Sequence, residues 1–180
     1  MQKTFTLFIL LLSVLTFSQD FRFEEVVKVD STAKKDELFN RARTWTGQIF
    51  SGKNSLITTE DRQTGEISGV GNYDYRADKE YDGFECVEGP VAYKYSIFVK
   101  DGRFKYLFNS FVHTGSRGPS CRQINYGTLT LMNQAPLKGK GIADDRAWAD
   151  VKEKTASKIQ SLVSELKEAM NKKYEGSNDW

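Results

Sequence analysis

The sequence predicts an α+β fold of two layers, in which two helices pack on one face of an antiparallel sheet. A β-hairpin over Val91–Val112 is expected at the centre of that sheet, and an amphipathic helix is expected near each end of the domain. The predicted order is one strand, one helix, four strands and a final helix. A chain of 180 residues is long enough to bury a sizeable core as a single domain.

The central hairpin is predicted from apolar and polar residues that alternate on both sides of Asp101-Gly102. An Asp-Gly pair between two such runs favours a two-residue turn of type I′, which needs a positive φ at both residues. The cross-strand pairs expected on the apolar face are Val99 with Phe104, Ile97 with Tyr106, and Tyr95 with Phe108. If the alternation continues, Val112 lies on this face and His113 lies on the opposite one.

The first predicted strand covers about Phe21–Asp30 and leads into a helix over about Ala33–Phe50. Asp30-Ser31-Thr32 precede the helix, and their side-chain oxygens are expected to cap its exposed amides. Steps of three and four separate the apolar residues of its buried face, which is the spacing of an amphipathic helix. These residues are Leu38, Ala42, Trp45 and Ile49, widened by Phe39, Thr46 and Phe50.

Two further strands are predicted over Leu56–Glu60 and Glu66–Tyr75. Gly69 and Gly71 lie inside the second strand, and glycines there usually mark close backbone approach, so we expect a helix to pack tightly on them. Arg76–Pro90 is expected to be a polar connection. The segment from Ile124 to Gln134 alternates like a short strand, but its glycine and asparagine limit the length.

The last long helix is predicted to begin near Asp144, with acidic residues at its start and Lys172-Lys173 at its end, as the helix dipole favours. Its apolar stripe consists of Trp148, Val151, Thr155, Ile159, Leu162, Leu166 and Ala169, with Val163 and Met170 alongside. Residues 175–180 are expected to form a polar tail, so the single α+β domain is placed at residues 19–174.

The amino terminus predicts export. Lys3 is followed by the apolar run Phe5–Phe17, which is typical of a secretory signal peptide at residues 1–18 with cleavage after Ser18. That run is shorter than the roughly 20 residues of a membrane-spanning helix, so no span is expected after cleavage; an uncleaved anchor is the alternative. The expected location is the periplasm or the cell exterior.

Cys86 and Cys121 lie just outside the two ends of the hairpin. Export would place them in an oxidising compartment, where a disulfide between them is expected to stabilise the fold by roughly 3–4 kcal/mol. Two unpaired buried thiols are the alternative.

The composition limits the classes of partner that the chain could bind. The formal net charge is +2, charged residues make up 28% of the chain, and basic and acidic residues are interspersed without a polybasic block. The chain therefore lacks the positive patch that nucleic-acid binding needs, and it is neither disordered nor a bundle of membrane helices.

Several segments carry a resemblance to a known family. They are Lys35–Ala42 leading to Trp45, Gly65–Gly71, and Tyr95–Val99 followed by Asp101–Tyr106. Over roughly Glu24–His113 the chain resembles the exported bacterial family described as a domain of unknown function with a TBP-like (TATA-box-binding-protein-like) fold. The resemblance implies that fold and brings no established activity or catalytic residues. The fold is named after a DNA-binding protein, but a shared fold does not imply a shared function.

Catalytic chemistry finds little support in the sequence. His113 is the sole histidine and is expected to be a surface residue; the alternative is that, with Ser116, it serves a small secreted hydrolase as base and nucleophile. Two distant cysteines and one histidine do not make a zinc site, and Asp144, Asp145 and Asp150 suit a helix start better than calcium. No catalytic residue, metal or cofactor is predicted.

The sequence suggests two candidate binding surfaces. One is the loop that presents Arg117 and Arg122, whose guanidinium groups suit carboxylates and phosphates. The other is the outer face of the hairpin, where apolar side chains lie among polar ones, unless a loop covers them. Its residues are Phe98, Leu107 and Phe111 with Lys94, Lys100, Arg103, Lys105 and Asn109. We expect a non-catalytic binding module for an envelope protein or a small anionic ligand; the alternatives are the hydrolase and a structural subunit of an envelope assembly.

Overall fold

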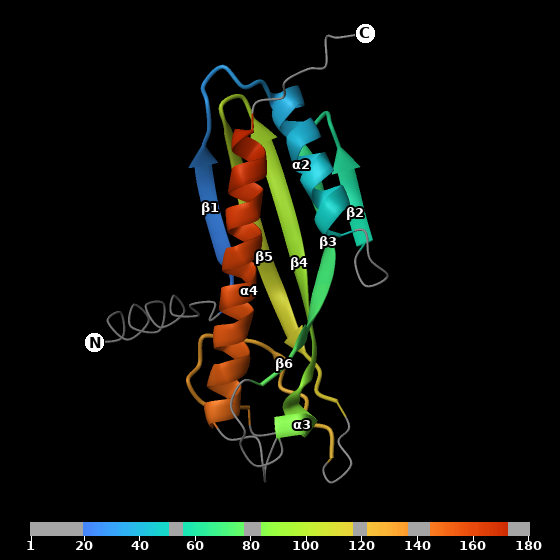
Figure 1. Cartoon of the computed structure of the whole chain (residues 1–180), viewed down its shortest axis with the longest axis vertical. Coiled ribbons are helices and arrows are strands. Elements are labelled where there is room, and N and C mark those ends of the chain that lie inside the picture. Colours follow the sequence, from blue (N-terminus) through green and yellow to red (C-terminus); the bar gives the residue numbers. More distant parts are fainter. Residues whose placement is uncertain (1–19, 51–55, 78–83, 117–121, 137–144, 173–180) are drawn as a thin grey trace, which may run out of the picture.

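The computed structural model describes residues 20–50, 56–77, 84–116, 122–136 and 145–172. Within them a six-stranded sheet carries two long helices on one face, which confirms the predicted two-layer α+β fold (Figure 1). The elements are, in chain order, β1 (Phe23–Lys28), α2 (Lys35–Ile49), β2 (Leu56–Asp61), β3 (Glu66–Tyr75), α3 (Phe84–Val87), β4 (Gly89–Lys100), β5 (Arg103–His113), β6 (Gly127–Thr128) and α4 (Asp145–Asn171).

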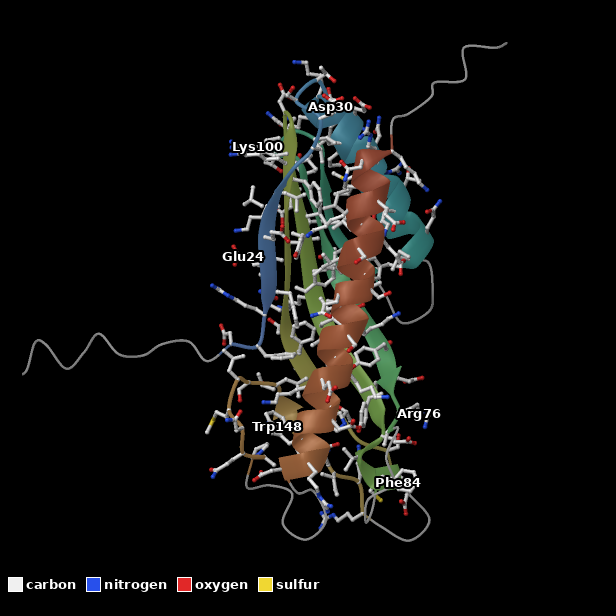
Figure 2. The ribbon with its side chains drawn as sticks, turned by 60° about the vertical axis from the view of Figure 1, so that its left-hand side comes forward. Glu24, Asp30, Arg76, Phe84, Lys100 and Trp148 are labelled. Carbon is white, nitrogen blue, oxygen red and sulfur yellow. The ribbon has the colours of Figure 1, made fainter. Side chains whose placement is uncertain are left out.

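The strand order is β1-β5-β4-β3-β2, every pairing is antiparallel, and β6 pairs with β5. The predicted hairpin is therefore the centre of the sheet. Seen from the side, the sheet and the helices form two layers, and among the described residues no helix covers the other face of the sheet (Figure 2). The strand β6 lies within the segment Ile124–Gln134, whose alternation resembles that of a short strand. The helix α3 lies in the predicted polar connection Arg76–Pro90, and its four residues carry too little periodicity to predict it.

The hairpin has the predicted register, with Val99 opposite Phe104, Ile97 opposite Tyr106 and Tyr95 opposite Phe108. Its turn, however, is not of type I′. Gly102 has a φ of 69°, but Ser110 is the sole non-glycine residue with a positive φ in the described ranges, so Asp101 does not share that conformation. Contacts from outside the hairpin hold the turn: the Gly102 N–H donates to Ala33 O, and Gly102 O accepts from the Val29 N–H.

The amino-terminal cap of α2 differs from the predicted one, because Asp101 provides it. The residue before α2, Lys34, makes no side-chain capping bond. Asp30 Oδ1 instead accepts a hydrogen bond from the Thr32 N–H, within its own turn. The Lys35 N–H at the start of α2 donates to Asp101 Oδ1 at 2.7 Å. The first turn of the helix is thus capped by the tip of the hairpin.

A bulge overturns the predicted faces at the end of the hairpin. The register shifts between Ala92 and Lys94 on β4, and opposite it Ser110 has a φ of 55°. The extra residue reverses the alternation, as bulges do. Phe111 and His113 are consequently buried on the core side, whereas Val112 is 40% exposed. The predicted positions of all three residues are wrong for this one reason.

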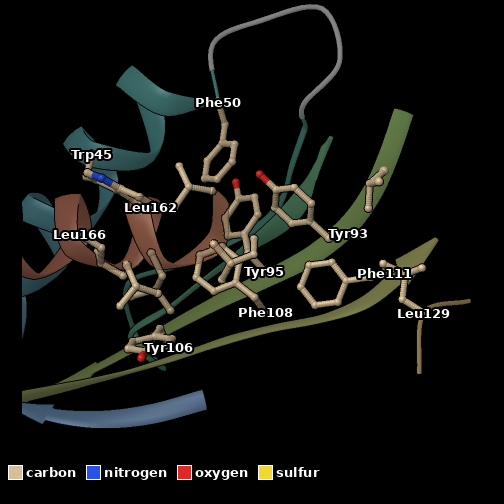
Figure 3. Close-up of a cluster of buried hydrophobic side chains, with 14 of the residues drawn as sticks. Trp45, Phe50, Tyr93, Tyr95, Tyr106, Phe108, Phe111, Leu129, Leu162 and Leu166 are labelled. Atoms are coloured by element: carbon tan, nitrogen blue, oxygen red, sulfur yellow. The ribbon is translucent and has the colours of Figure 1, made fainter. Parts of the chain in front are cut away.

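The core fills the space between the sheet and the helices (Figure 3). Phe50 stacks on Tyr95 with ring centroids 4.2 Å apart, and Phe111 meets Phe21 and Phe23 edge to face. Such aromatic pairs add about 0.5–1.5 kcal/mol each beyond the area they bury. The predicted apolar stripes of both helices face this core; Ile49 and Ala169 are partly exposed at its border.

Gly69 and Gly71 make room for two tyrosine side chains and not, as predicted, for a helix. A Cβ on Gly69 would lie 2.5 Å from the hydroxyl of Tyr95, and one on Gly71 would lie 2.9 Å from the ring of Tyr93. The glycines therefore leave room for two aromatic side chains of the neighbouring strand β4, which pack against the backbone of β3.

Arg41 joins the two long helices. It is 6% exposed on the buried side of α2, where its guanidinium group donates to Met170 O of α4 and to the Glu37 carboxylate. A buried cation needs such partners, because its desolvation is costly without them. None of the described helices is both long enough and apolar enough to cross a membrane.

Candidate functional site

The outer face of the sheet, opposite the helices, presents its side chains in rows set by the strand register. One row runs Val26, Lys105, Phe98 across β1, β5 and β4, and the next runs Lys28, Arg103, Lys100. Neighbouring rows are about 7 Å apart along the strands, and neighbouring side chains in a row are about 5 Å apart. Figure 2 shows Lys100 and Glu24 on the side of the sheet away from α4.

These two rows border a pocket of about 440 Å³. It is lined by Val26, Phe98, Lys100, Arg103, Phe104 and Lys105. Val26 is 58% exposed and Phe98 is half-buried, so the apolar part of the pocket meets solvent. The volume is within the range of small-molecule sites, about 300–1,000 Å³.

Positive charge is concentrated on one part of this side of the sheet, over β1, β4 and β5, whereas β2 and β3 carry the outer-face carboxylates Asp61, Glu66 and Asp74, and Glu66 lies opposite Phe98. On β1, β4 and β5 the outer-face cations are Lys28, Lys94, Lys100, Arg103 and Lys105, and they share those strands with one outer-face carboxylate, Glu24. Glu24 forms an ion pair with Lys105 at 2.5 Å, and this hydrogen bond lowers the pKa of the Glu24 carboxyl.

The row of three cations is not neutralised. In the described part of the chain, Lys28, Lys100 and Arg103 have no ion-pair partner. Asp101, which lies between Lys100 and Arg103 in the sequence, caps α2 and is 3.8 Å from Lys34. Because like charges directly opposite one another destabilise a sheet, this row would gain from an anion.

The predicted site residues divide into three groups. Phe98 and Lys105 line the pocket, and Leu107 is half-buried on the same face. Phe111 does not belong to that face, because the bulge turns it into the core, where it is 0% exposed. Of the two loop arginines, Arg122 is exposed and Arg117 lies outside the described residues, so the proposed pair stays a prediction.

Val26 and Lys28 complete the pocket and its cation row, yet sequence reasoning did not select them. Their alternation in β1 was visible, but nothing in the sequence showed that β1 lies beside β5. That neighbour relation is a property of the topology.

His113 is a structural histidine and not the predicted surface residue. Its side chain is 0% exposed, Nε2 lies 2.6 Å from Val87 O, and Nδ1 accepts a hydrogen bond from the Tyr126 N–H at 3.3 Å. Burial lowers the pKa of its imidazole, so the neutral ring is favoured. Both nitrogens are engaged in tying β5 to α3 and to the segment before β6, and neither is available as a hydrolytic base.

The acidic and cysteine candidates also have defined places. Asp145 Oδ1 accepts from the Ala135 N–H, and Asp150 accepts from the hydroxyl of Tyr75, while Asp144 lies outside the described residues. Throughout the described ranges, no three acidic, histidine or cysteine side chains are grouped to hold a metal ion. Cys86 is buried in α3 and is not a free thiol; Cys121 lies outside the described residues, and the pairing stays a prediction.

Comparison with known proteins places this geometry in context. A family described as "Domain of unknown function (DUF4468) with TBP-like fold" matches residues 23–114. No curated protein matches the sequence significantly.

Two solved structures share the fold. A TBP-like protein from Parabacteroides distasonis ATCC 8503 superposes with a TM-score of 0.67 at 15% identity, covering 85% of this chain and 94% of its own. A DUF4468 family protein from Bacteroides ovatus ATCC 8483 gives 0.63 at 13% identity, covering 87% and 89%. At such identities the likeness establishes the fold alone.

Proposed function

Because the chain belongs to the DUF4468 family of domains of unknown function with a TBP-like fold, we propose a function from its own surface. It is an exported, non-catalytic binding module that holds its partner on the outer face of the sheet. The observation that carries this proposal is the absence of a helical cover over that face in the described structure.

Exposed apolar side chains support the proposal. Val26, Leu56 and Val70 are 58%, 62% and 36% exposed, and all three lie on the outer face of β1, β2 and β3. Val26 lies at one edge of the sheet and the paired Leu56 and Val70 lie toward the other, and apolar area bordered by polar groups often marks an interaction surface. The hydrolase alternative has lost its base, because both nitrogens of His113 are engaged.

Export is the second part of the proposal. It is supported by the charged start and apolar run over residues 3–17 and by the two cysteines at the ends of the hairpin. Buried in α3, Cys86 would connect the lower end of the sheet to the loop that carries Cys121. The loop arginines Arg117 and Arg122 would then be presented beside the same sheet.

Site-specific photo-crosslinking in the native host tests the binding face. A benzophenone amino acid replaces Val26 on the outer face, and in a matched control it replaces the exposed Lys158 on α4. We expect ultraviolet light to give a defined adduct with Val26 replaced and none with Lys158 replaced, the adduct being identified by mass spectrometry. The same pattern at both positions, or no adduct at Val26, would contradict the proposal.

A further inference from the structure

We propose that the pocket on the outer face binds a small carboxylate-headed amphiphile. The carboxylate would pair with Arg103 and the lysines on either side of it, Lys28 and Lys100, and the apolar tail would lie over Val26 and Phe98. The inference rests on the proposed function, since it names the ligand of the same face.

Charge complementarity selects the head group. The row Lys28, Arg103, Lys100 places three cations side by side, each exposed and without an ion pair in the described residues. A guanidinium group accepts a carboxylate in a two-pronged geometry, which makes Arg103 the centre of the head-group site. Lys105, the remaining cation of the pocket, is already paired with Glu24.

The apolar part follows from the adjacent row. Val26 and Phe98 lie on either side of Lys105, whose aliphatic stem joins them into one strip next to the cations. A ligand that is charged at one end and apolar at the other matches this arrangement, with its charged end on the cation row and its apolar end on the strip of Val26 and Phe98. A fully hydrophilic anion would leave Val26, 58% exposed, in water.

The size of the pocket disfavours a second copy of the chain as its occupant. The pocket holds about 440 Å³, which suits one small molecule.

Binding of three probes to the exported protein tests the ligand class: octanoate, 1-octanol with a similar tail and no charge, and acetate with the head alone. Titration followed by methyl and amide NMR shifts gives the affinities and the site. We expect octanoate to perturb Val26 and Phe98 and to bind at least tenfold more tightly than either of the other two probes, a difference of about 1.4 kcal/mol. Added salt should weaken the binding.

Variants of the pocket then test which cations bind the carboxylate. The double substitution Lys100→Gln with Arg103→Gln is expected to weaken octanoate at least tenfold. Lys94→Gln, an exposed lysine on the same face of β4 but outside the pocket lining, is expected to leave the affinity unchanged. All three side chains are exposed, so an unchanged melting temperature should show that folding is intact.

Each other outcome overturns the inference. Equal affinity for octanoate and acetate would show a general anion site, and equal affinity for octanol would show a purely apolar one. Binding to anionic phosphatidylglycerol vesicles without binding to octanoate would show a membrane surface. If octanoate does not bind but the protein with Val26 replaced still forms a crosslink, only the proposed ligand class is wrong. If octanoate does not bind and no crosslink forms, the proposed function is also wrong.

Discussion

The buried imidazole of His113 makes the stability of this domain sensitive to mildly acidic pH. The ring accepts a hydrogen bond from the Tyr126 N–H and lies against Val87 O, so the fold uses its neutral form. A protonated ring would lose the first bond and bring a charge into a site without solvent. The imidazole therefore has a lower pKa in the folded chain than in the unfolded one.

The sign of the pH effect follows from that direction. The contribution to stability is complete above the unfolded pKa, 6.5, and is lost as pH falls from there toward the lowered folded pKa. We expect the free energy of unfolding from urea titrations to decrease between pH 7.5 and pH 5. Because His113 is the sole histidine, His113→Gln should abolish this dependence, and a persistent slope in the variant would exclude the imidazole as its cause.

Asp101 caps the helix α2, which is distant in the sequence, through one carboxylate oxygen. It accepts the hydrogen bond of the Lys35 N–H at the first turn of α2. Asp101→Ala should lower the free energy of unfolding by about 1 kcal/mol, the usual effect of losing a helix cap. Asp101→Asn keeps an oxygen acceptor and should retain most of that stability; equal losses in both variants in chemical denaturation would rule out the capping role.

At the scale of elements, the two glycines at positions 47 and 69 give opposite predictions for the same change. Gly69→Ala would drive its methyl group into the Tyr95 hydroxyl and the backbone of β2, so we expect a loss of about 1–3 kcal/mol. Gly47→Ala lies in α2 with nothing within 4 Å, and it should gain about 0.5–1 kcal/mol. Thermal unfolding of both variants against the parent chain measures the pair.

The elements themselves were largely predictable. β3 has the predicted bounds, α2 and α4 lie within one or two residues of theirs, and the pairing of the hairpin is as predicted. Long periodic segments carry many residues that agree with one another, which is why they can be recognised. The face of Phe111 could not be predicted, because a single extra residue at Ser110 reverses every later side chain.

The candidate site was predictable in part. Phe98 and Lys105 were selected from alternation within one hairpin, and they line the pocket. Val26 and Lys28 come from a strand that is distant in sequence, and their place depends on the pairing of β1 with β5. The capping of α2 by Asp101 depends in the same way on contacts between segments, which local patterns do not contain.

At the scale of the whole molecule, the predicted disulfide makes a claim about both fold and location. Protein isolated from outside the cytoplasm, unfolded in denaturant without reductant, is expected to release no reactive thiol in a dithionitrobenzoate assay. Reduction should then expose two thiols, one for each cysteine of the sequence, and should lower stability by roughly 3–4 kcal/mol. Two thiols before reduction would exclude the bridge.

The cap on α2 has a consequence for the order in which the domain matures. Lys35 and Asp101 are 66 positions apart, so during synthesis the helix leaves the ribosome long before its capping carboxylate exists. β1 likewise waits for β5 before it has a neighbour to pair with. Neither of these two contacts of the early segments can therefore form before the hairpin β4–β5 has been synthesised.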